Sequence, residues 1–132
     1  MILAAIAPEC MVTINAAPSE SQIAFLPANL AALPETGQMY GSKANLNLET
    51  LLAADPQVVI DLGDKKGDMA EDLDALQEQI GIPVIFIEAD LPHMAEAFRT
   101  LGGLLSGKAD RGEFLAALVD RTTTMAEENA AK

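Results

Sequence analysis

Short apolar runs alternate with amphipathic segments between residues 47 and 105, and this alternation limits the folds open to the chain. Residues 58–60 are a continuous β-branched run, and residues 82–87 form a second apolar run. Between them, residues 69–80 carry apolar side chains at helical spacing, and Gly81 follows as a stop signal. This strand–helix–strand–helix order predicts a mainly parallel sheet flanked by helices, because parallel strands need a crossover connection.

Shorter signals surround this central region. Residues 11–14 and 38–40 are brief strand candidates, and Pro18-Ser19-Glu20 is expected to open a helix. Asn47 and Asp90 stand where each can cap the helix that follows it. We therefore expect an α/β fold in three layers, a Rossmann-like lobe with helices on both faces of the sheet, ending in a long C-terminal helix.

The last predicted helix spans residues 110–130. At about 1.5 Å per residue it is about 30 Å long, whereas a strand of ordinary length spans about 17–20 Å. Its far end is therefore expected to leave the sheet. From spacing alone, a frayed tail and a strut toward a second domain remain equally open.

Composition excludes some functions. The 132 residues suit one domain, and 8 basic against 20 acidic residues give a net charge of −12. This charge argues against nucleic-acid binding and against docking on an anionic membrane. Cys10 is the only cysteine, so no internal disulfide forms. The apolar run at residues 2–7 is too short for a membrane span and lacks the basic start of a signal peptide.

Candidate ligand contacts lie in loops. In an open parallel sheet, ligands bind beyond the carboxyl ends of the strands. That rule selects the loops at residues 15–17, 40–45, 61–67 and 88–90. Three of the 8 basic residues lie in two of them, as do the only tyrosine and other polar side chains. Lysines suit carboxylate or phosphate groups of a ligand, although each alone can be an ordinary solvated side chain. The predicted ligand-binding residues are Tyr40, Ser42, Lys43, Asn45, Lys65 and Lys66.

Catalytic and metal-binding patterns are weak. His93 is the only histidine, and the sequence places no second histidine or cysteine near it, so neither a metal site nor a catalytic base is predicted. No glycine-rich nucleotide loop is present either, and no cofactor is expected. The chain is predicted not to be an enzyme.

A resemblance to a known family rests on an ordered set of short motifs. A glycine is followed by Asn-x-Glu opening a helix, then by leucines and a Pro-x-x-Val-Ile strand, and the later segment GIPVIFIEAD fits the same order. The matching residues are Gly41, Asn47, Leu48, Glu49, Leu51, Leu52, Pro56, Val58, Val59 and Ile60. Gln57 departs from the pattern, which commonly has Asp there. The chain thus resembles the N-terminal lobe of ABC-transporter substrate-binding proteins of the cobalamin and iron–siderophore class.

The resemblance implies binding of a metal chelate (a ferric siderophore, haem or a corrinoid) between two lobes joined by a long helix. By it, residues 1–109 form the substrate-binding lobe and residues 110–132 begin the interlobe helix. Glu49 matches a glutamate that docks the lobe on an ABC permease. The location implied is extracytoplasmic, either periplasmic or lipid-anchored as a lipoprotein.

Several parts that the resemblance implies are not found in these 132 residues. They are the strand ahead of the first helix, the second lobe, a signal peptide and a lipid-anchor cysteine. A lobe without one central strand is expected to expose a sheet edge, and the isolated lobe could pair with another copy as a homodimer.

Other readings remain open. A receiver-like signalling module would use Asp61 as its phospho-acceptor, but the acidic pair that it needs after the first strand is replaced by Asn15-Ala16-Ala17. A small α/β enzyme would need a nucleophile or cofactor loop that the sequence does not reveal. A non-catalytic interaction module in a larger assembly is the third reading.

Overall fold

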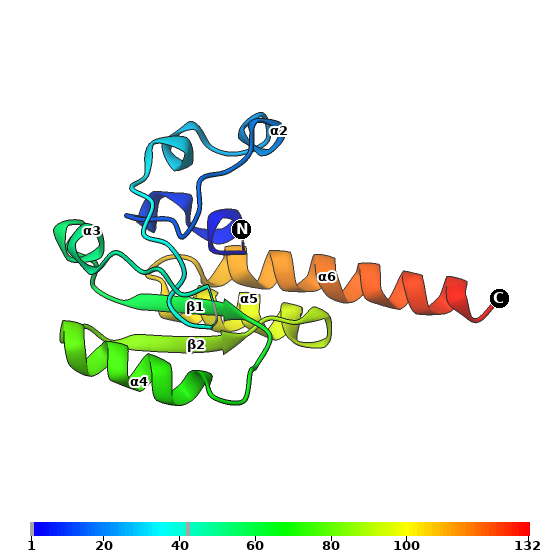
Figure 1. The fold of residues 1–132 in the computed structure, drawn as a ribbon. Coiled ribbons are helices and arrows are strands. Elements are labelled where there is room, and N and C mark those ends of the chain that lie inside the picture. The colour runs from blue at the N-terminus through cyan, green and yellow to red at the C-terminus, as the bar shows by residue number, and fades with distance from the viewer. Residues whose placement is uncertain (1, 42) are drawn as a thin grey trace. The chain divides into compact units, whose positions relative to one another are not determined.

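The computed structural model describes residues 2–41 and 43–132 (Figure 1). Its helices are α1 (Ile2–Ile6), α2 (Glu20–Ile23), α3 (Leu48–Ala53), α4 (Met69–Ile80), α5 (Met94–Leu104) and α6 (Ala109–Ala130). Its 3₁₀ turns are η1 (Pro8–Cys10), η2 (Ala28–Ala32) and η3 (Leu91–His93). Its strands are β1 (Val59–Gly63) and β2 (Val84–Glu88).

The chain divides into two compact units. The first, here called the helical unit, contains the described residues 2–7, 62–64 and 87–132. The second, here called the loop unit, contains residues 8–61 and 65–86.

The strands β1 and β2 pair as a two-stranded parallel sheet, as the alternation of apolar runs predicts. The pairing begins with a hydrogen bond from the Val59 N–H to the Pro83 carbonyl (2.9 Å). It ends with one from the Ala89 N–H to the Gly63 carbonyl (3.0 Å). Because β1 continues to Gly63, the prediction that a loop begins at Asp61 is wrong: Asp61 lies inside the strand, and the polar loop starts at Asp64.

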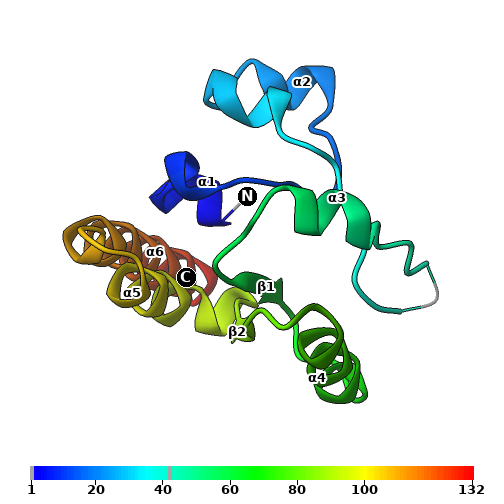
Figure 2. The same ribbon diagram turned by 90° about the vertical axis from the view of Figure 1, so that its left-hand side faces the viewer.

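The helical unit is built on the packing of α5 against α6, which run side by side in both views (Figures 1 and 2). Leu101 is fully buried, and Phe98, Leu115 and Ala116 join it in the core. α1 packs on both helices, and the Arg111 side chain donates to the Ala5 carbonyl (3.2 Å). Arg99 joins the two long helices on the outside, donating to Glu113 at 3.0 Å and to Asp120 at 2.8 Å.

The loop unit contains the other predicted helices. The expected cap of α3 is confirmed, because the Asn47 side chain accepts a hydrogen bond from the Thr50 N–H (3.0 Å). The predicted end of α4 is also confirmed, since Gly81 adopts φ 67° and a left-handed conformation there suits glycine. Met69, Leu73 and Leu76 form the buried face of α4.

The predicted strands at residues 11–14 and 38–40 are wrong. Ile14 makes only an isolated parallel bridge with Glu35, and no strand forms at residues 38–40. Two local causes are visible. Pro34, which accepts from the Ile14 N–H, has no N–H of its own to extend a ladder, and the Gln38 N–H is bonded to the Asn45 side chain instead. Among the described residues the sheet therefore has two strands. The expected three-layer, Rossmann-like lobe is not observed in this part of the chain.

The predicted long C-terminal helix is confirmed as α6. Its N-terminal half packs on α5 through Gly112, Leu115 and Ala116. Phe114, Leu118 and Met125 are at least 46% exposed, and their spacing places them on one face of the helix. No described helix is long and apolar enough to cross a membrane.

Candidate functional site

Three of the polar residues in the predicted loops meet within the loop unit. The Tyr40 hydroxyl donates a hydrogen bond to the Asp61 carboxylate at 2.6 Å. The Lys66 ammonium lies 5.7 Å from the centroid of the Tyr40 ring, within the range of a cation–π interaction. The sequence predicted Tyr40 and Lys66 as ligand-binding residues, and the structure places them beside each other, with Tyr40 hydrogen-bonded to Asp61 of β1.

The environment of Tyr40 keeps its phenol protonated. Partial burial, the hydrogen bond to Asp61 and the negative charge of that carboxylate together raise the pKa of Tyr40 from 10.0 to about 12. Tyr40 therefore remains a neutral hydrogen-bonding group with an apolar ring up to a higher pH than an ordinary tyrosine does.

The loop that presents Tyr40 is closed at its base by Asn45. The Asn45 side chain accepts from the Gln38 N–H (2.8 Å), and the Asn45 N–H donates to the Gln38 carbonyl (3.1 Å). Gly37 makes this closure possible, since it adopts φ 85° and a Cβ there would lie 2.7 Å from the Asn45 carbonyl oxygen. Asn45 thus has a structural role that the sequence did not reveal.

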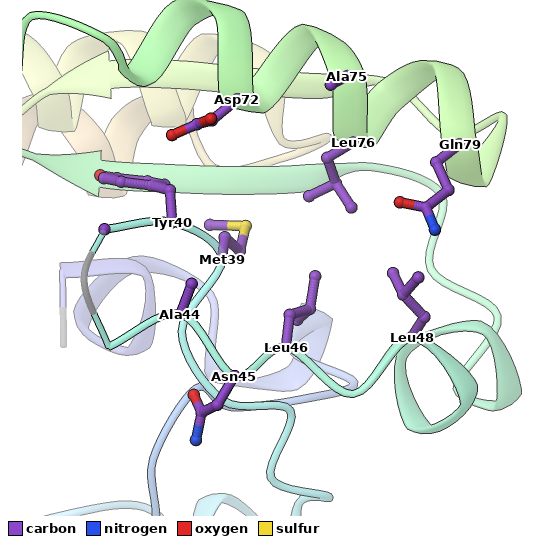
Figure 3. A pocket seen from close by; sticks show the side chains of 11 residues that line it. Met39, Tyr40, Ala44, Asn45, Leu46, Leu48, Asp72, Ala75, Leu76 and Gln79 are labelled. Carbon is purple, nitrogen blue, oxygen red and sulfur yellow. The ribbon is translucent and has the colours of Figure 1, made fainter.

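A pocket of ≈ 460 Å³ lies between this loop and α4 (Figure 3). Leu46, Leu48 and Leu76 point toward one another across it, and Tyr40 and Asp72 stand near one end. The Asn45 side chain points away from α4, in keeping with its bond to Gln38. The pocket therefore has an apolar floor with a phenol and a carboxylate beside it. Its lining is Met39, Tyr40, Gly41, Ala44, Asn45, Leu46, Leu48, Asp72, Ala75, Leu76 and Gln79.

The other predicted site residues are placed as follows. Lys43 and Lys65 are exposed, in the segments before and after β1 respectively. Ser42 lies outside the described residues. Glu49 is exposed in the first turn of α3, where the positive end of the helix dipole favours its carboxylate.

One group of potential metal ligands was not predicted from the sequence. Glu88, Asp90 and His93 offer ligand atoms that all lie within 4.8 Å of one another, at the carboxyl end of β2 in the helical unit. The sequence signal was present as three metal-binding residue types within six positions after an apolar run. Because carboxylate oxygens bind such metals as well, a metal site here does not require a second histidine or cysteine.

Comparison with solved structures found a resemblance for most of the chain. The structure resembles an ABC transporter solute-binding protein from Sulfurospirillum deleyianum DSM 6946, with a TM-score of 0.72 and 27% sequence identity. The match covers 88% of this chain and 36% of that protein, so the chain spans about a third of its length. No family model and no curated protein sequence matches the chain. The chain is thus similar, over most of its length, to part of an ABC transporter solute-binding protein.

Proposed function

We propose that this chain is one lobe of the extracytoplasmic solute-binding component of an ABC importer, and that its solute is a metal chelate. The observation that carries the proposal is the structural likeness over 88% of the chain at 27% identity. Such a lobe binds its solute and releases it to a permease without covalent chemistry.

The chemistry of the loops supports an anionic, partly apolar solute. Lys43, Lys65 and Lys66 are exposed cations in a chain of net charge −12, so they are local exceptions to its overall charge. They suit the carboxylate, phosphate or catecholate groups of a ferric siderophore, haem or corrinoid. The Tyr40 ring adds a flat surface, already in contact with one cation, on which a conjugated ligand can stack.

The exposed face of α6 supports a two-lobe parent protein. Phe114, Leu118 and Met125 form an apolar stripe along a helix whose other face is buried on α5. An exposed apolar stripe on a long helix is typical of a surface that another domain covers. We propose that α6 begins the interlobe helix and that residues beyond this sequence, in a second lobe, cover the stripe and complete the solute site.

The proposal is tested with the complete gene product. Calorimetric titration with a ferric siderophore, haem and cobalamin should give saturable binding of one of the three. Lys66→Ala should weaken that binding about ten-fold, because a hydrogen bond to a charged group contributes about 1.5–3 kcal/mol. Lys132→Ala, a lysine outside the predicted set, serves as the control and should bind as the unaltered protein does. Absence of binding to all three ligands would exclude the metal-chelate class.

A further inference from the structure

The side chains of Glu88, Asp90 and His93 form a compact group that the proposed solute site does not use. Glu88 is the last residue of β2, Asp90 caps η3, and His93 ends that turn. All belong to the helical unit, and their ligand atoms lie within 4.8 Å of one another. Because the end of β2 is followed closely by the turn η3, the imidazole of His93 and the two carboxylates lie close together.

Asp90 fixes the orientation of the His93 ring. Its Oδ1 accepts a hydrogen bond from the His93 N–H (3.0 Å) and is also hydrogen-bonded to the ring Nδ1. In the neutral imidazole, an Nδ1–H donated to a carboxylate leaves the lone pair on Nε2. A carboxylate that orients a histidine through its other nitrogen is a common arrangement behind metal-binding imidazoles.

The Nε2 atom faces a second carboxylate. Glu88 Oε2 lies 3.8 Å from His93 Nε2. Metal–nitrogen and metal–carboxylate bonds are each about 2.0–2.2 Å long, so one ion can bond to both atoms across this gap. The His93 and Glu88 side chains are 50% and 38% exposed, which leaves room for water to complete the coordination.

Electrostatics favour a cation at this position. The Glu88 and Asp90 carboxylates both lie beside the His93 ring, where their negative charges attract a dication. The chain as a whole carries a charge of −12, which adds to this attraction.

We propose that Glu88 and His93 bind a first-row divalent transition-metal ion, with Asp90 as the positioning carboxylate. An imidazole with a carboxylate suits Zn²⁺ or Ni²⁺, whereas Mg²⁺ and Ca²⁺ prefer sites made of oxygen alone. This site would bind a free metal ion and not a chelate. The proposal therefore does not depend on whether the chain binds a chelate.

The single histidine makes a direct test practical. Zinc sulfate is titrated to millimolar concentration into untagged protein near neutral pH, and the His93 imidazole is followed by ¹H–¹⁵N nuclear magnetic resonance. We expect saturable shifts that are larger at Nε2 than at Nδ1. Magnesium at the same concentration should leave the signal unchanged. A His93 signal that zinc does not move, or a larger shift at Nδ1, would overturn the proposal.

Variants separate the roles of the two carboxylates. Glu88→Gln should weaken zinc binding by at least about ten-fold because it removes a ligand, and Asp90→Asn should weaken it about 10–100-fold because it removes the orienting partner. Glu96→Gln is the matched control, an exposed carboxylate on α5 outside the group. Zinc affinity that is unchanged in Glu88→Gln, or that falls equally in Glu96→Gln, would show that the ion binds elsewhere on this acidic chain.

Discussion

Gly102 and Gly112 lie against each other where α5 packs on α6. A Cβ added to Gly112 would lie 2.5 Å from the Phe98 carbonyl oxygen and 2.9 Å from the Gly102 Cα. A Cβ added to Gly102 would lie 3.1 Å from the Gly112 Cα. The two backbones therefore approach so closely that neither helix has room for a side chain there.

We predict that Gly112→Ala lowers the free energy of unfolding by about 1–3 kcal/mol, because the helices must separate to admit the methyl group. Gly103→Ala is the control, since nothing lies within 4 Å of a Cβ at that position in α5. It should be neutral or stabilising by up to about 1 kcal/mol, as alanine favours a helix. Urea unfolding of both variants measures the difference, and equal stabilities would contradict the close packing.

A second prediction concerns the pH dependence of Tyr40. Because its pKa is raised from 10.0 to about 12 in the folded chain, the folded state holds the phenolic proton more tightly than the unfolded state. Tyr40 therefore contributes stability that is fully present below pH 10 and is lost as pH rises through about 12. Ultraviolet titration of phenolate, with this single tyrosine as the reporter, should give a midpoint near the raised value.

Asp61→Asn tests the cause of that shift. Removing the carboxylate should bring the Tyr40 midpoint part of the way back toward 10.0, since burial, the largest cause, remains. A midpoint that does not move in this variant would mean that the hydrogen bond to Asp61 does not form in solution.

A third prediction concerns the start of α3. Asn47→Ala should lower the free energy of unfolding by about 1 kcal/mol, because the Thr50 N–H loses the side-chain acceptor that caps the helix. Asn47→Ser supplies another oxygen at the same place and should retain most of the stability. If the alanine and serine variants unfold at the same urea concentration, the cap contributes nothing.

A fourth prediction separates two roles of Glu49. If this exposed carboxylate docks the proposed permease, Glu49→Ala in the complete gene product should reduce solute uptake by cells and leave solute affinity unchanged. If it acts only on the helix dipole, the same variant loses about 0.3–1 kcal/mol of stability while uptake persists. Glu78→Ala, an exposed glutamate of α4, is the control and should not affect uptake.

Local chemistry in the sequence determined the elements of the central region. The β-branched runs became β1 and β2, the apolar spacing and Gly81 bounded α4, and the long amphipathic segment became α6. The polar side chains of Asn47 and Asp90 cap the turns that they precede. These features depend on residues a few positions apart, so the sequence is enough to predict them.

Contacts between distant residues depend on tertiary packing, which a local pattern does not report. The Tyr40 ring could have faced solvent, and its bond to Asp61 depends on how the loop closed by Asn45 lies against β1. Residues 11–14 likewise form no strand because of the segment that lies beside them. That segment contains Pro34, which has no N–H to extend the pairing. The residue pattern of a segment indicates only the structure that the segment itself favours. Strand pairing and site geometry depend on partners twenty or more residues away, whose positions are decided by the packing of the whole unit.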